Sequence, residues 1–309
     1  MKNIYEVQQS NKVKSALVIV GFLLFVTLTV YVLAQAFAFY LGYSPGGLGF
    51  FGLALIVSGI STLVSYYFSD SIVLGISGAR PASRKTDFEF YTVAQNISIG
   101  TGLPMPKLYV IADSAPNAFA TGRDPAHSVV CATEGLLEKL NRTELEGVVA
   151  HEMSHIRNYD TRLMSLVTVM VGLVALLGDW FLRMSWFGGR SRDKEEGNLG
   201  AVFMFLGIIF ALLSPIVSQI VQLAISRRRE FMADSGSVEI TRQPEGLILA
   251  LQKISKDIEP LEAANKATAH LYIVNPFKEG RRGAVTWFSH LFDTHPPVEE
   301  RIKALKAMI

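Results

Sequence analysis

The 309-residue chain is more apolar than an ordinary soluble domain, with 50% hydrophobic residues, 18% charged residues and a mean hydropathy of +0.32. This composition favours a membrane protein. A formal net charge of +2 is too small at this length to indicate a nucleic-acid-binding protein. The single cysteine, Cys131, excludes an intrachain disulfide and gives no indication of a cysteine-rich zinc site. Any metal must therefore be held by histidine and carboxylate ligands.

No Asp, Glu, Lys or Arg occurs between Lys14 and Asp70, a stretch of 55 residues. A transmembrane helix needs about 20 apolar residues, so this stretch predicts two helices, at residues 15–40 and 48–68, with a turn at 43–47. The alternative is a signal peptide cleaved near Ala34 to Ala36. We favour the helical hairpin, because the apolar run is far longer than the roughly 7–15 residues of a signal peptide's core.

Two further apolar segments follow at residues 163–182 and 201–225, separated by a charged connection at 190–196. The first of them is barely long enough to cross a membrane, because its apolar run has only 15 residues, 163–177, before Gly178 and Asp179. It either spans obliquely or is partly buried against protein. The chain is thus expected to contain an N-terminal transmembrane hairpin (1–70), a polar part (71–162), a second hydrophobic hairpin (163–225) and a second polar part (226–309), with about four transmembrane helices.

The polar parts have an α+β pattern that is mainly helical. Residues 87–99 are expected to form a helix that ends in the segment 100–104 (GTGLP). Strands are expected at 107–111 and 128–132. A further helix begins with Asn141 or Thr143 as its cap, Thr143 and Glu146 having capping-box spacing, and carries the segment HEMSH. Helices are also expected at 245–254 and at 296–308, the latter after Thr294 and two prolines.

His151, Glu152 and His155 form an H-E-x-x-H motif within HEMSH (151–155). Residues four apart lie on one face of a helix, so both imidazoles can bind one Zn²⁺ ion. Glu152 then lies beside the metal, where it can act as general base. The alternative, a coincidental surface helix, is disfavoured because the chain has only six histidines.

A catalytic zinc usually has three protein ligands, so one more is needed. Glu230 and Asp234 lie four residues apart, directly after the fourth apolar segment. Glu230 could be the third ligand, and Asp234 could hold a ligand imidazole. Spacing alone leaves an alternative equally open, in which both belong to a solvated helix end after Arg227 to Arg229.

The chain resembles the HtpX membrane proteases, which are relatives of the C-a-a-X prenyl proteases. The resemblance rests on HEMSHIRNYD (151–160), a hydrophobic hairpin, SRRREFMADSGS (226–237), PNAFATG (116–122) and THPP (294–297), and it covers nearly the whole chain. It implies a zincin-type catalytic domain of the gluzincin class with one Zn²⁺ per chain. It also implies that Glu230 is the third zinc ligand and that Asp234 does not bind the metal itself but supports the ligands.

The resemblance also implies an edge strand at Asn117, Ala118, Phe119 and Ala120 that pairs with an extended substrate. The alternative is an ordinary strand with Phe119 in the core. His295 is a candidate donor to the oxyanion, or else a plain helix-start residue. His127, His270 and His290 match no ligand spacing and are interpreted as surface or packing residues.

The H-E-x-x-H motif predicts zinc-dependent endopeptidase activity. The resemblance implies that the substrates are damaged or misfolded membrane proteins, in protein quality control and the stress response. The expected partners are polypeptide substrates and the lipid bilayer, and no nucleic acid. A catalytically idle membrane adaptor with a structural metal is the first rival, but it has no use for Glu152 beside an open metal position. A dedicated prenyl-protein protease is the second, and the small number of spans disfavours it.

Zinc geometry also predicts the topology, because His151 and His155 before the second hairpin must meet Glu230 after it. Lysines and arginines flank the first hairpin on the side of the zinc site, so the positive-inside rule places this side in the cytoplasm of a cell-membrane protein.

In a Cys131→Ala background, we expect Ser44→Cys to react with an impermeant thiol reagent on intact cells. Labelling of Ser83→Cys or Ser114→Cys before lysis would contradict the cytoplasmic assignment.

Overall fold

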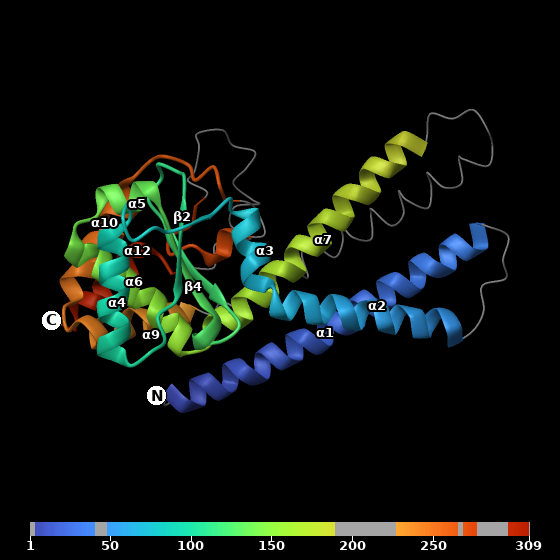
Figure 1. Ribbon diagram of the computed structural model, residues 1–309, viewed down its shortest axis with the longest axis horizontal. Helices are drawn as coiled ribbons and strands as arrows, with labels where there is room; N and C mark the ends of the chain where they lie inside the picture. The colour runs from blue at the N-terminus through green and yellow to red at the C-terminus, as the bar shows by residue number, and fades with distance from the viewer. Residues whose placement is uncertain (1–3, 41–47, 189–226, 265–267, 277–295, 309) are drawn as a thin grey trace.

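The computed structural model describes residues 4–40, 48–188, 227–264, 268–276 and 296–308. A compact α+β domain carries three long helices that project from one side of it (Figure 1). These are α1 (Ile4–Tyr40), α2 (Leu48–Tyr67) and α7 (Asp160–Gly188). The domain is mainly helical with one small sheet, as the sequence predicts.

The first apolar stretch forms helices where they are expected. Residues 6–35 of α1 are long and apolar enough to cross a membrane, with a mean hydropathy of 2.7. A bend of 72° separates α2 from the short helix α3 (Ser69–Ile76), and this pair together is a second candidate span. The Thr27 and Ser58 hydroxyls lie 2.6 Å apart and join α1 to α2 by a hydrogen bond.

The third apolar segment begins inside the domain. In the first part of α7, Leu163, Val167 and Val174 are buried against the sheet and α3. This agrees with the interpretation that the segment is partly buried against protein. The fourth segment, 201–225, lies outside the described residues, so crossing of a membrane by four helices stays a prediction.

The sheet has four strands in the order β1-β2-β4-β3. The first strand, β1 (Arg80–Pro81), pairs antiparallel with β2 (Lys107–Ile111), which pairs parallel with β4 (Ser128–Thr133). The last strand in the order, β3 (Ala118–Gly122), pairs antiparallel with β4 and forms the edge of the sheet. Both strands predicted from β propensity are present, and β3 lies in the segment that the family resemblance marks as an edge strand.

The helices of the domain agree with their sequence signals. Helix α4 (Phe88–Thr101) ends at Gly102, whose φ of 68° is a left-handed conformation that favours glycine. Asn141 caps α6 (Arg142–Arg157) in a capping box with Glu144, so Asn141 rather than Thr143 is the cap. The remaining described helices are η1 (Pro125–His127), α5 (Glu134–Lys139), α9 (Arg227–Thr241), α10 (Pro244–Lys256), η2 (Ala269–Leu271) and α12 (Val298–Lys306).

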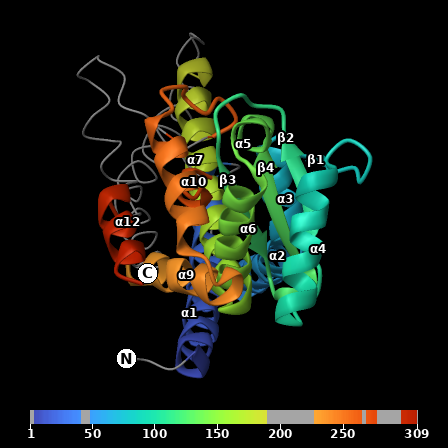
Figure 2. The ribbon, with the colours of Figure 1, turned by 90° about the vertical axis from the view of Figure 1, so that its left-hand side faces the viewer.

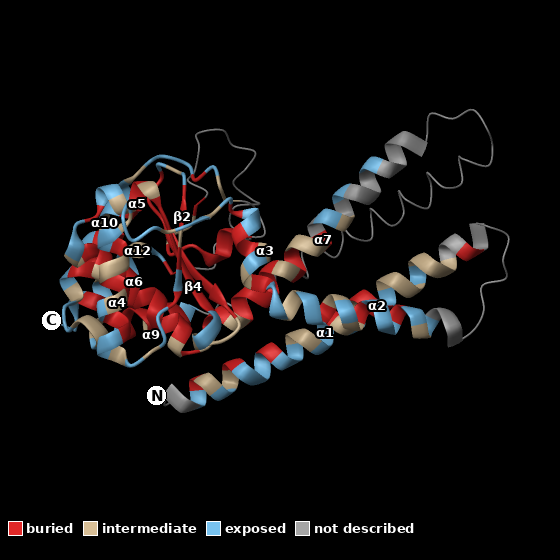
Figure 3. Cartoon of the chain, in the orientation of Figure 1, coloured by how far each residue is buried: buried red, intermediate tan, exposed pale blue. Residues whose placement is uncertain are grey.

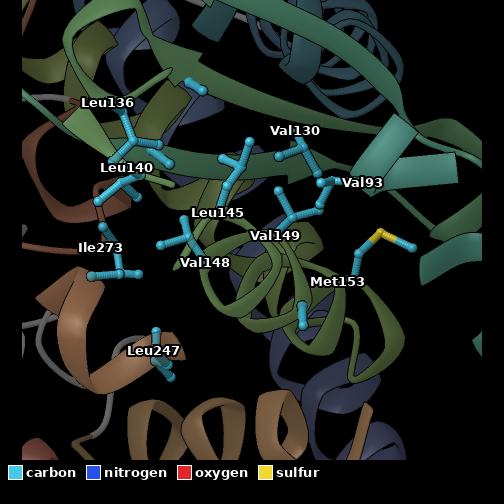
Figure 4. Close-up of a cluster of buried hydrophobic side chains, with 14 of the residues drawn as sticks. Val93, Val130, Leu136, Leu140, Leu145, Val148, Val149, Met153, Leu247 and Ile273 are labelled. Atoms are coloured by element: carbon cyan, nitrogen blue, oxygen red, sulfur yellow. The ribbon is translucent and has the colours of Figure 1, made fainter. Parts of the chain in front are cut away.

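Side chains alternate between the two faces of the sheet, and both faces are buried. One face packs on α4, α6 and α10, through residues such as Val93, Val149 and Leu247 (Figure 4). Figure 3 shows that the strands and parts of the helices around them are buried. The other face packs on α3 and α7, with Phe119 and Tyr272 in edge-to-face contact. Helix α6 is therefore enclosed between the sheet and α9 and α10, which fixes the position of the H-E-x-x-H motif.

Gly147 lies at a close approach of α6 and α10. A Cβ atom there would lie 2.6 Å from the backbone nitrogen of Leu247 and 2.9 Å from its Cα. We expect Gly147→Ala to destabilise the protein by up to about 2 kcal/mol, because overpacking costs about 1–3 kcal/mol and the gain in helix propensity offsets about 1 kcal/mol of it. Thermal unfolding in detergent measures this. The control is Gly100→Ala in α4, where an added Cβ meets nothing within 4 Å; equal melting temperatures for both variants would contradict the close approach.

Candidate active site

Helix α6 brings the three motif residues to one buried place. His151 and His155 lie one turn apart with ring centroids 4.8 Å from each other, and Glu152 lies between them in sequence. Exposure of all three residues is 5% or less. Burial of three ionisable side chains is costly without partners, so the surrounding residues must supply them.

Helix α9 supplies the next partner, Glu230. Its Oε1 atom lies 3.5 Å from Nε2 of His155, and its Oε2 atom lies 3.7 Å from Nε2 of His151. The two Nε2 atoms are 3.2 Å apart. Two nitrogen ligands about 2.0–2.1 Å from a tetrahedral zinc are separated by about 3.3 Å, so the arrangement fits one zinc ion. His151, His155 and Glu230 are also the described residues whose ligand atoms all lie within 4.8 Å of one another.

Each imidazole is held from behind by a carboxylate. Nδ1 of His151 lies 3.0 Å from Oδ1 of Asp234, and Nδ1 of His155 lies 3.0 Å from Oδ2 of Asp160. A carboxylate at Nδ1 favours the tautomer with its proton there, which leaves the Nε2 lone pair for a metal. Both rings therefore present Nε2 to the same point.

Arg301 of α12 balances the negative charge on this side of the site. Its Nε and Nη2 groups donate to the two oxygens of Asp234 at 2.9 and 2.6 Å, and its Nη1 donates to the carbonyl of Ile273. Nη1 also lies 3.5 Å from Oε2 of Glu230. Arg301 is fully buried, so this fork-to-fork pair is part of the interior rather than of a solvated surface.

Without a bound metal ion, the pKa values of the two imidazoles shift in opposite directions. Burial lowers the pKa of His151 to about 4, so this ring is neutral at pH 7. Burial also acts to lower the pKa of His155, but the carboxylates of Asp160 and Glu230 outweigh it and raise this pKa well above 6.5. Burial raises the pKa of Glu152 to about 7, and the nearby Glu230 adds to the rise. A carboxyl group with such a pKa can both accept and return a proton near neutral pH.

The edge strand β3 passes beside Glu152. The backbone of Ala120 lies near the Glu152 carboxylate and acts to lower the pKa of that group, and the small side chains of Ala118 and Ala120 face the core on the α6 side. The outer edge of β3 is partly occupied, because the carbonyl of Ala118 accepts a hydrogen bond from the N–H of Ile273 at 2.9 Å. The side-chain amide of Asn117 donates to the carbonyl of Val274.

The other predicted residues divide into two groups. His295 and His290 lie outside the described residues. His127 is half exposed and pairs with Asp124, and His270 is buried with its Nε2 atom 3.0 Å from the Thr168 hydroxyl. These two agree with surface and packing roles.

Sequence reasoning missed Asp160 and Arg301. Asp160 lies inside the HEMSHIRNYD segment, five residues after His155, and the spacing to a ligand histidine is a usable signal for a buried partner. Arg301 lies 71 residues after Glu230, in a segment rich in charged residues, and nothing local distinguishes it from its neighbours.

This fold and this site define a metallopeptidase, with an H-E-x-x-H helix and a glutamate from a second helix converging on one point. The profile of Peptidase family M48 matches residues 85–309. The chain is 44% identical over 308 residues to a protease HtpX homolog of Dictyoglomus turgidum, covering 98% of this chain and 94% of that protein. It is 41% identical to a protease HtpX homolog of Caldanaerobacter subterraneus subsp. tengcongensis, covering 99% of this chain and 98% of that protein.

The chain belongs to Peptidase family M48 and is a metalloprotease, a hydrolase of peptide bonds. Among solved structures, the crystal structure of S. mikatae Ste24p aligns with 98% of this chain and 66% of its own length, with a TM-score of 0.46 and 16% identity. A similarity of that size is too low to establish a shared fold. The family membership and the apolar helix α1 together support a membrane-associated protease.

The roles of Glu230 and Asp234 can be separated by metal analysis. We expect Glu230→Ala to lower zinc occupancy strongly, because it removes a ligand, and Asp234→Asn to weaken zinc affinity about 10–100-fold, because it loosens His151. Both are measured by competition with a chromophoric chelator on protein purified in detergent. Full zinc retention in Glu230→Ala would move the third ligand to another carboxylate.

Proposed function

We propose that this protein is a zinc-dependent membrane endopeptidase that hydrolyses damaged or misfolded membrane proteins in protein quality control. The observation that carries the proposal is Glu152, a buried carboxylate that lies beside the His151, His155 and Glu230 cluster and also beside the edge strand β3. A purely structural metal site needs no such group.

His151, His155 and Glu230 would hold the zinc ion, one per chain. Zinc in such a site supplies Lewis-acid chemistry, which polarises a carbonyl group and lowers the pKa of water. Asp234 and Asp160 keep the two imidazoles oriented. Arg301 keeps Asp234 ionised, because the burial of that carboxylate would otherwise raise its pKa.

Glu152 moves the proton. As the water oxygen bonds to the scissile carbonyl carbon, one of its protons passes to the Glu152 carboxylate. When the carbon–nitrogen bond then breaks, this proton passes to the nitrogen of the leaving amine. His295 is the proposed donor to the oxyanion on the carbonyl oxygen.

Substrate is proposed to bind in extended form along Asn117, Ala118, Phe119 and Ala120, by adding a strand to the edge of the sheet. Backbone pairing of this kind places the scissile bond by its main chain and demands little of the side chains. The backbone of residues 273–274 lies on the Asn117 end of this edge. A substrate strand would therefore meet β3 first at Ala120, next to Glu152.

The apolar helix α1 supports the proposal that the substrates are membrane proteins, because a helix that crosses the membrane would hold the catalytic domain beside the bilayer. Four spans, a cytoplasmic catalytic domain and a role in the stress response belong to the same proposal. They rest on hydropathy, on the distribution of Lys and Arg and on the resemblance to the HtpX proteases.

We expect purified wild-type protein to cleave unfolded casein, and a zinc chelator to abolish this activity. Glu152→Gln should still bind zinc but lose essentially all hydrolysis, because the ligands remain and the base does not. Casein cleavage at the wild-type rate by Glu152→Gln would refute the mechanism. Cleavage of a prenylated C-a-a-X peptide without cleavage of casein would instead indicate a prenyl-protein protease.

The melting temperature of the metal-free protein shows whether Glu152→Gln folds. The pKa of Glu152 is raised from 4.5 in the unfolded chain to about 7 in the folded protein. Ionisation of Glu152 therefore lowers the free energy of unfolding fully above pH 7. This loss of stability decreases as the pH falls from 7 and is absent below pH 4.5. The shift corresponds to a penalty on the order of 3 kcal/mol. Metal-free Glu152→Gln should therefore melt at a higher temperature than metal-free wild type at pH 8, with a smaller difference at pH 5.

A further inference from the structure

The beginning of α1 contacts the turn that follows the H-E-x-x-H motif. Helix α1 starts beside the catalytic domain and then runs away from it (Figures 1 and 2). The side-chain amide of Gln8 donates to the carbonyl of Arg157 at 2.9 Å, and Nζ of Lys12 lies 4.5 Å from the centre of the Tyr159 ring. The same helix that is apolar enough to cross a membrane is thus attached to the end of the catalytic helix.

The turn between α6 and α7 needs such contacts. Tyr159 has a φ of 60°, a left-handed conformation that is uncommon for residues other than glycine and persists where the surroundings impose it. Both Lys12 and Arg162 contact its ring, the guanidinium of Arg162 being 5.0 Å from the ring centre. This turn decides where the next residue, Asp160, is placed.

Asn11 joins α1 to Asp160 itself. Nδ2 of Asn11 donates to Oδ1 of Asp160 at 2.7 Å and to the carbonyl of Asn158 at 2.9 Å. The other oxygen of Asp160 lies 3.0 Å from Nδ1 of His155. Asn11 and Asp160 are 2% and 1% exposed, so water does not compete for these hydrogen bonds.

The two oxygens of Asp160 therefore have different partners, and the carboxylate plane is fixed between them. Arg229, also buried, lies 3.6 Å from Oδ1 and balances the charge without a direct hydrogen bond at this geometry. Asn11 is uncharged and donates a hydrogen bond to the same oxygen, Oδ1 of Asp160. A carboxylate that can rotate would still attract His155, but it would not hold the ring in one orientation.

We propose that Asn11 is a positioning residue for the metal site: it orients Asp160, and through Asp160 it orients His155, so that the N-terminal helix helps to set the affinity for the metal. This inference rests on the proposed role of His155 as a zinc ligand. Neither Asn11 nor α1 touches the metal position.

The test compares two residues of α1 that both bond to the same turn. We expect Asn11→Ala in the full-length protein to weaken zinc affinity about tenfold, the lower end of the range for residues behind a ligand. Gln8→Ala removes a similar bond, to Arg157, and should leave the affinity unchanged. Chelator competition measures the affinity, and the visible spectrum of the Co²⁺-substituted protein reports ligand geometry independently of activity.

A double-mutant cycle distinguishes positioning from simple attachment of the helix. Because Asn11 acts through Asp160, Asn11→Ala should add nothing to the affinity loss of Asp160→Asn. Additive losses, or equal losses in Asn11→Ala and Gln8→Ala, would overturn the proposal. If Asn11→Ala does not fold, Asn11→Leu keeps the branched shape, removes both donated bonds and is judged by the same criteria.

The outcome for the proposed function is separate. Wild-type protein that binds neither Zn²⁺ nor Co²⁺ would refute the metal site itself, and with it this inference. Normal metal binding and casein cleavage by wild type, together with wild-type affinity and cobalt spectrum in Asn11→Ala, would refute the positioning role alone.

Discussion

Buried charge is the constraint on which the rest of this structure depends. Ionisable groups from four helices meet in one interior region, and each would be costly there without its neighbours. Glu230 faces both histidines, and Asp234 is neutralised by Arg301. These pairings fix α6, α9 and α12 relative to one another more strictly than hydrophobic contact does, because hydrogen bonds to charged groups tolerate little displacement. Among the residues that the structure describes, this group consists of His151, Glu152, His155, Asp160, Arg229, Glu230, Asp234 and Arg301.

The sheet and its two covered faces provide the rigid support for this region. Helix α6 lies against β3, where alanines leave room for a helix to approach the strand, and Phe119 points to the opposite face. A catalytic group on a helix packed in this way is held more precisely than one on a loop. The same packing brings Glu152, the proposed general base, next to a strand edge, so a single arrangement would serve both the proposed chemistry and the proposed binding of an extended chain.

The apolar helices are not separate from the catalytic domain. The first part of α7 is core, and the first turns of α1 bond to the turn after α6. The proposed positioning role of Asn11 gives a physical route by which a shift of α1, the helix that is apolar enough to cross a membrane, would alter the site. The route needs no large motion, because it consists of two consecutive side-chain contacts, from Asn11 to Asp160 and from Asp160 to His155.

The sequence by itself determined the features that depend on short-range geometry. The H-E-x-x-H helix, the Asn141 cap option, the strands β2 and β4 and the long apolar helices follow from spacing, capping and β propensity. Hydropathy could not separate a segment that faces lipid from one buried in protein, since both are apolar, and this is why the segment 163–182 could be interpreted either way. Only the tertiary structure brought Arg301 to Asp234 and Asn11 to Asp160, because contacts across 67 and 149 residues depend on how the whole chain packs and leave no periodic signal in the sequence.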